Sequence, residues 1–166
     1  MVVREFSAGG LVYKKQGDQV LWLIRRPQGG GDYRGNLGWS FPKGWLDDAE
    51  GGEKPGPLAS GQKRASETEL QQAALREVAE EGGVEAEIRA KLPSLKIFFT
   101  DKNGQKILKF ILYFVMEWRE DLKEGFGSET AEIRWVTQEE ALQLLAHKNE
   151  KDLLKEAHRR SCLTVA

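Results

Sequence analysis

The chain contains 166 residues, of which 40% are hydrophobic and 31% are charged. This length allows one domain with a sizeable core, and this composition excludes a disordered or fibrous chain. The formal net charge of −1 excludes a strong overall field, so we expect neither a nucleic acid polymer nor a membrane as a partner. A small anionic ligand would have to be held by local lysines and arginines or by a metal ion.

The single cysteine, Cys162, excludes an internal disulfide framework and a cysteine-based zinc site. A reducing, cytoplasmic compartment is therefore the simplest expectation. We find no signal peptide and no apolar run of membrane-spanning length in the sequence. The sequence does not indicate an oligomeric state.

The N-terminal part predicts a β-hairpin and then a loop. Residues 6–13 and 20–24 have the composition of two strands, and the second strand leads into Arg25 and Arg26. Residues 28–38 are rich in glycine and predict a surface loop.

Residues 47–65 are rich in glycine and proline and show no apolar periodicity. We predict that this segment is a flexible surface insertion without regular secondary structure. A lid over a binding cleft is the alternative, because loops of this length are either functional or disordered.

The next run of residues predicts a helix, since Ala, Leu, Arg and Glu dominate it and no proline interrupts it. Ser66 or Thr68 can supply the N-cap, and Ser66 with Glu69 fits a capping box. Gly82 or Gly83 can adopt the left-handed conformation that ends such a helix.

Three carboxylates, Glu77, Glu80 and Glu81, share one face of this helix because they are spaced at i, i+3 and i+4. Like charges at this spacing cost about 0.2–0.5 kcal/mol per pair, and they also meet the negative end of the helix dipole. Arg76 offsets part of this repulsion, and a divalent cation such as Mg²⁺ or Mn²⁺ would offset more. The alternative is a glutamate-rich helix end that is simply exposed to solvent.

Two long strands are predicted at residues 88–100 and 105–118, with an Asn103-Gly104 hairpin turn between them. The second strand carries apolar residues on both faces, so we expect it in the centre of a sheet. Residues 129–136 predict a loop that leads into a short strand.

Thr137 and Glu140 fit a second capping box, which opens a helix through Leu145, and a further helix is predicted at 149–160. Strands with covering helices predict an α/β fold in which helices flank a mixed β-sheet. We expect a single domain over residues 1–166, with a C-terminal helical extension at 149–166.

The order of residues in the carboxylate helix resembles the second half of the Nudix box, G-x5-E-x7-R-E-U-x-E-E-x-G-U, in which U is aliphatic. All seven specified positions of R-E-U-x-E-E-x-G-U are filled, by Arg76, Glu77, Val78, Glu80, Glu81, Gly83 and Val84. Upstream, residues 39–45 (WSFPKGW) are similar to the segment that carries the first glycine of the box. The resemblance covers roughly residues 4–147. It implies the Nudix fold, an α/β/α sandwich around a mixed sheet, and a phosphoanhydride hydrolase.

The front half of the box departs from the family pattern, which has fourteen positions from the first glycine to the arginine. Here Gly44 and Arg76 lie 32 positions apart, so 18 are extra. No single glutamate keeps the spacing to both ends. The candidates for the first glutamate of the box are Glu50, Glu67 and Glu69.

The resemblance also implies roles for individual residues. Glu77, Glu80 and Glu81 would bind Mg²⁺ or Mn²⁺, and the carbonyl of Gly44 would add a ligand. Arg76 would orient a glutamate of the group. The general base would be either Glu77 or Glu129, because the family draws it from different places.

For the substrate, the resemblance implies a small-molecule nucleotide. Pro-Lys-Gly at Pro42-Lys43-Gly44 is similar to branches that act on dinucleoside polyphosphates and diphosphoinositol polyphosphates. We therefore expect a dinucleoside polyphosphate such as diadenosine tetraphosphate. The candidates for contacts to it are Lys43, Arg25, Arg26, Lys109 and Tyr113. The alternatives are a nucleoside triphosphate pyrophosphatase of nucleotide-pool cleaning and a non-catalytic domain that senses a nucleotide.

Overall fold

The computed structural model describes residues 1–29 and 38–165. Most of the loop predicted at 28–38 therefore lies outside the described residues. The strands are β1 (Val2–Gln16), β2 (Gln19–Pro27), β3 (Lys43–Trp45), β4 (Asp48–Ala49), β5 (Lys54–Pro55), β6 (Val84–Lys91), β7 (Leu95–Thr100), β8 (Lys106–Asp121) and β9 (Thr130–Val136). The helices are α1 (Glu67–Gly82), α2 (Gln138–Leu144) and α3 (Lys148–Val165), with a short 3-10 turn η1 (Glu50–Gly52).

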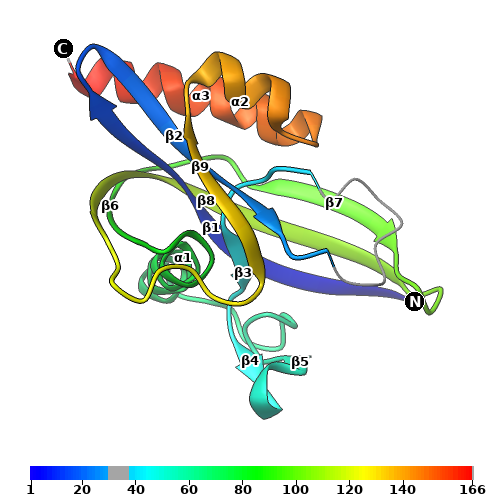
Figure 1. The fold of residues 1–166 in the computed structure, drawn as a ribbon. Helices are drawn as coiled ribbons and strands as arrows, with labels where there is room; N and C mark the ends of the chain where they lie inside the picture. Colours follow the sequence, from blue (N-terminus) through cyan, green and yellow to red (C-terminus); the bar gives the residue numbers. More distant parts are fainter. Residues whose placement is uncertain (30–37, 166) are drawn as a thin grey trace.

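The main sheet is mixed and follows the order β6-β8-β1-β2-β9 (Figure 1). Strand β1 runs parallel to β8 and antiparallel to β2 and β3. The two ends of β8 pair with different strands, β7 near its start and β6 near its end. This arrangement leaves β6 and β9 as the edges of the main path.

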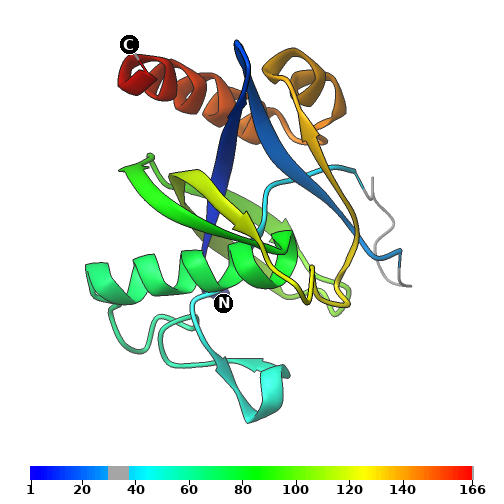
Figure 2. The same ribbon diagram turned by 60° about the vertical axis from the view of Figure 1, so that its left-hand side comes forward.

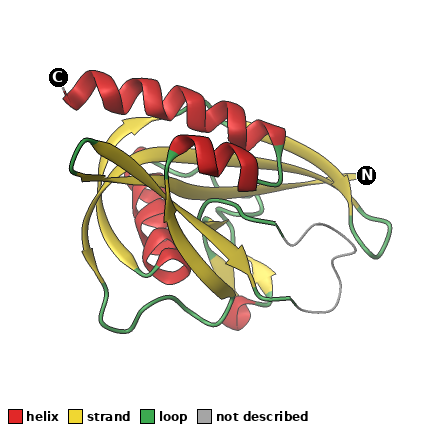
Figure 3. Ribbon diagram, turned by 45° about the horizontal axis from the view of Figure 1, so that its top comes forward, coloured by secondary structure: helices red, strands yellow, loops and turns green. Residues whose placement is uncertain are grey.

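Helices cover both faces of this sheet, with α1 on one side and α2 and α3 on the other (Figures 2 and 3). The strands alternate their side chains between these two layers. In β8, Tyr113 packs in the core under α2 and α3, whereas Phe114 and Met116 pack in the core under α1. The predicted α/β sandwich and the central, two-sided position of β8 are confirmed. No helix among the described residues combines the length and apolarity needed to cross a membrane.

Helix α1 begins and ends at the residues that local signals indicated. The Ser66 side chain accepts a hydrogen bond from the Glu69 backbone N–H, and the Glu69 side chain accepts one from the Ser66 N–H. Gly83 has a φ of 69° and donates its N–H to the carbonyl of Ala79. Gly83, rather than Gly82, is therefore the left-handed C-cap.

The single strand predicted at 88–100 is wrong, because the structure has two strands, β6 and β7, separated at residues 92–94. Pro93 has no N–H to donate to a sheet ladder, so pairing is interrupted there. The chain resumes pairing on the other half of β8.

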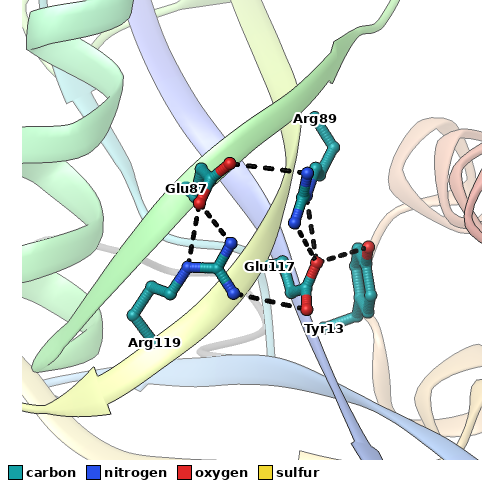
Figure 4. Close-up of polar contacts among 5 residues, drawn as sticks. All are labelled: Tyr13, Glu87, Arg89, Glu117 and Arg119. Carbon is teal, nitrogen blue, oxygen red and sulfur yellow. Dashed lines mark hydrogen bonds and ion pairs between the residues drawn. The ribbon is translucent and has the colours of Figure 1, made fainter.

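The edge strand β6 presents charged side chains that form ion pairs with its neighbour β8 (Figure 4). Arg89 lies 2.7 Å from Glu117, which also accepts a hydrogen bond from the Tyr13 hydroxyl, and Arg119 pairs with Glu87. Such pairs are exposed and each stabilises the fold little. Their charge does make this edge a poor template for pairing with another strand.

The insertion at 47–65 differs from the prediction, because it contains β4, η1 and β5 and is attached to the sheet. The Asp47 carboxylate accepts hydrogen bonds from the N–H groups of Leu58 (3.0 Å) and Ala59 (2.7 Å). Ala59 is fully buried, and its carbonyl accepts the Phe6 N–H at 2.8 Å. The segment is therefore not independent of the core.

We predict that Asp47→Ala destabilises the fold by about 1–3 kcal/mol, because two amide N–H groups lose their acceptor. The matched control is Asp48→Ala, since Asp48 is exposed and we expect a change within about 0.5 kcal/mol. Urea unfolding of both variants measures the difference. Equal stabilities would show that the insertion is not anchored through Asp47.

Candidate functional site

The C-terminal half of α1 directs two glutamates into the protein. Glu77 and Glu81, which stand one turn apart, are each only 8% exposed, whereas Glu80 is exposed. Among the described residues, no three acidic, histidine or cysteine side chains form a ready metal-binding group. The three-carboxylate cluster expected from spacing is thus a buried pair with a third, exposed member.

Glu77 lies directly against the backbone of Gly44. A Cβ atom at position 44 would stand 2.2 Å from the Glu77 carboxyl carbon, so any side chain there would displace the Glu77 carboxylate. Arg76 donates to the Trp45 carbonyl (2.7 Å) and to the Glu77 carboxylate (3.2 Å). Arg76 therefore ties the segment after Gly44 to Glu77, which agrees with an orienting role. That role in catalysis stays a prediction.

Glu81 holds the residue before Gly44. One of its carboxylate oxygens accepts the Lys43 N–H at 2.9 Å and lies 3.7 Å from Nε of Arg25. Burial raises the pKa of Glu81, and the nearby Arg25 and Lys43 oppose this effect. Burial and the neighbouring Glu81 raise the pKa of Glu77 to about 7.

Arg25 has a different role from the expected phosphate contact. It is only 7% exposed, and its guanidinium donates to the Thr130 hydroxyl (3.0 and 3.1 Å) and to the Glu129 carbonyl (2.9 Å). The Thr130 hydroxyl in turn donates to the Glu81 carbonyl at 2.8 Å. Arg25 therefore fixes the start of β9 beside the end of α1, and the structure does not bring it to an open surface.

Lys43 on β3 and Lys109 on β8 are both half-buried, and the charge of Lys43 acts on Lys109. Burial and then the charge of Lys43 lower the pKa of Lys109, while Glu5, Glu81 and Glu77 oppose this effect. Two lysines that repel each other beside buried carboxylates form a place where bound phosphate would relieve the repulsion. Lys43 and Lys109 therefore stay predictions as substrate contacts.

The other predicted site residues, Arg26, Tyr113 and Glu129, have different surroundings. Arg26 forms an ion pair with Glu132 at 3.5 Å, with both side chains partly exposed. Tyr113 is fully buried and packs edge-on against Phe41, so it cannot stack on a base in this structure. Its hydroxyl has no hydrogen-bond partner among the described residues, and burial raises its pKa well above the usual range. The Glu129 side chain is exposed.

Glu150 was not predicted from the sequence. It is 4% exposed on α3, and its carboxylate accepts the Phe41 N–H at 3.3 Å. Burial raises its pKa, and nearby Lys43 opposes the effect. The sequence does contain a pattern that indicates this buried acid, because Glu150 shares an apolar helix face with Leu153, Leu154 and Ala157. A single acid in such a stripe indicates a specific buried partner.

We predict that Glu150→Leu costs about 1–3 kcal/mol of stability, because the buried Phe41 N–H loses its acceptor. Glu150→Gln keeps an acceptor oxygen and should cost clearly less. Chemical denaturation compares the two, with Glu139→Gln on the exposed face of α2 as the control. Equal losses for Leu and Gln would show that the hydrogen bond is not what matters.

Comparisons with known proteins agree with this fold. The putative mutator protein MutT4 of Mycobacterium tuberculosis is 31% identical over 159 residues, which cover 93% of this chain and 55% of that protein. The chain therefore spans about half the length of this curated relative.

Two solved structures share the fold. An Ap4A hydrolase of Caenorhabditis elegans, solved as a binary complex, has a TM-score of 0.61 at 17% identity and covers 95% of this chain and 98% of its own. The NUDIX domain of Shewanella oneidensis NrtR, complexed with ADP ribose, has a TM-score of 0.59 at 14% identity, with coverages of 95% and 88%. Residues 3–157 match the NUDIX domain family, and the chain therefore belongs to the Nudix hydrolase family.

Proposed function

We propose that this protein hydrolyses a phosphoanhydride bond in a nucleoside diphosphate-linked substrate with the help of Mg²⁺ or Mn²⁺. The observation that carries the proposal is the pair of buried carboxylates, Glu77 and Glu81, which both lie against the Lys43–Gly44 backbone. Arg25 and Arg76 neutralise this pair only in part, since the pKa of Glu77 is still raised to about 7. Hard carboxylate oxygens are the ligands that these two metal ions prefer.

Each residue has a role that follows from its position. Glu77, Glu81 and the Gly44 carbonyl would hold the metal ion, and the exposed Glu80 is available from the same helix end. When bound, the ion neutralises phosphate charge and lowers the pKa of a coordinated water. Arg76 keeps the Glu77 carboxylate in one orientation through its contact with the Trp45 carbonyl.

Glu129 is the better of the two candidate bases. Glu77 is buried and engaged with Arg76, whereas the Glu129 carboxylate is exposed. Its backbone is anchored, because the Glu129 carbonyl accepts hydrogen bonds from Arg25 (2.9 Å) and from the Gln28 N–H (3.0 Å). An exposed carboxylate on a fixed backbone, beside Glu81, can approach a water molecule at the site.

We predict that Glu81→Gln lowers turnover about 100-fold or more, because it removes a negative charge from the metal site. The amide oxygen can still accept the Lys43 N–H, so the fold should be kept. The rise in melting temperature caused by Mn²⁺ should also shrink, whereas the exposed control Glu124→Gln should change neither quantity. Near-normal turnover of Glu81→Gln at saturating Mg²⁺ contradicts the assignment.

Measured in the same assays, Glu129→Gln distinguishes a general base from a metal ligand at this position. Loss of a general base should lower kcat by about 10²–10⁴-fold while the thermal shift with Mn²⁺ stays normal. If the thermal shift falls together with kcat, Glu129 belongs to the metal site instead.

For the substrate we propose a dinucleoside polyphosphate such as diadenosine tetraphosphate. The support is the pair Lys43 and Lys109, which together can meet a longer phosphate chain than one cation can. The shared fold with an Ap4A hydrolase is compatible with this choice. A nucleoside triphosphate remains the competing substrate in the same assay.

We predict that kcat/KM for diadenosine tetraphosphate exceeds that for ADP-ribose and for nucleoside triphosphates. Lys43→Gln should lower kcat/KM about tenfold for diadenosine tetraphosphate, because one charge-assisted phosphate contact is lost. The decrease in kcat/KM for ADP-ribose should be smaller. Lys15→Gln is the matched control, since Lys15 is exposed at the far end of β1. A wild-type preference for ADP-ribose or a nucleoside triphosphate would refute the polyphosphate proposal alone and leave the metal-dependent hydrolase standing.

A further inference from the structure

A cavity of about 420 Å³ lies between the insertion, the start of α1 and strands β1 and β8. Its size falls within the range of small-molecule sites. None of the carboxylates Glu77, Glu80 and Glu81 lines it. Its apolar wall consists of Phe6, Leu46, Leu58, Leu70, Phe110 and Leu112.

Part of this wall is flat and held in place. The rings of Phe6 and Phe110 are stacked, with centroids 5.0 Å apart and planes 9° apart. Gly61 has a φ of +79°, and a Cβ atom there would lie 2.7 Å from the Phe6 ring. Any other residue at position 61 would be strained and would push on the ring, so glycine keeps the insertion close to Phe6.

The polar groups at the cavity favour an anion. Lys63, Arg64 and Lys91 line it, and no acidic residue does. Lys91 is paired with Glu67 at 2.9 Å, but Arg64 forms no ion pair with the residues that the structure describes.

We propose that this cavity binds a small organic anion with a flat apolar body. The body would lie against the apolar wall, and the acidic group would meet Arg64. This site is independent of the proposed hydrolase activity. It would also explain why the insertion is docked on β1 rather than left in solvent.

The test uses two probes with the same apolar rings, anilinonaphthalene sulfonate, which is an anion, and phenylnaphthylamine, which is neutral. We expect the sulfonate to bind folded wild-type protein at one site per chain, measured by calorimetry and fluorescence. Ala65→Phe, which adds a ring at a lining residue, should abolish binding of both probes. A thermal melt checks that this variant is folded.

The charge variant separates an anion site from a purely apolar one. Arg64→Glu should weaken the sulfonate about tenfold and leave the neutral probe unchanged. Lys155→Glu, an exposed charge reversal on α3, is the control and should change neither affinity. In wild type, nuclear Overhauser contacts from the sulfonate probe to Phe6 and Phe110 should be seen, which tests the location even if Ala65→Phe fails to fold.

Three results would overturn the proposal. Absence of saturable binding by the sulfonate rules out the site. Binding that survives in folded Ala65→Phe, or that shows no contact with Phe6 and Phe110, places the probe elsewhere. Equal effects of Arg64→Glu and Lys155→Glu show that no specific anion contact exists at the cavity.

Discussion

The structure depends on one electrostatic constraint, which is the burial of Glu77 and Glu81 one helical turn apart at the end of α1. Two like charges with little access to water are costly unless other groups stabilise them. Arg76 and Arg25 supply part of that stabilisation, and each also fixes a backbone segment beside the carboxylates. The same contacts that make the pair tolerable therefore shape the walls of the candidate site.

The segment that carries Gly44 is held from both faces of the sheet. Glu81 from α1 accepts the Lys43 N–H, and Glu150 from α3 accepts the Phe41 N–H, so the two contacts lie on either side of Pro42. Pairing of Lys43 with Gly9 of β1 adds a third restraint. These three contacts restrain the backbone on the N-terminal side of Gly44, whose carbonyl we propose as a metal ligand.

The parts of the fold that could be predicted are those set by neighbouring residues. The caps of α1 at Ser66 and Gly83 follow from groups within one turn of the chain, and the two apolar faces of β8 follow from alternation. The insertion could not be predicted in this way. Its attachment depends on the Asp47 carboxylate reaching two amides beyond the turn and on Phe6, which lies far away in sequence.

For the candidate site, the sequence indicated which residue types to consider but not which of them are buried. Arg25 looks like a free cation at a strand end, yet long-range contacts with Thr130 and the Glu129 carbonyl enclose it. The opposite error concerns Glu150, which is one of three acidic residues in α3 and matches no motif. Its place within an apolar stripe nevertheless indicated a buried contact, since a carboxylate is buried only where a hydrogen-bond donor or a cation pairs with it. A charged residue that breaks an apolar helix face is therefore a candidate positioning residue on the strength of its sequence pattern alone.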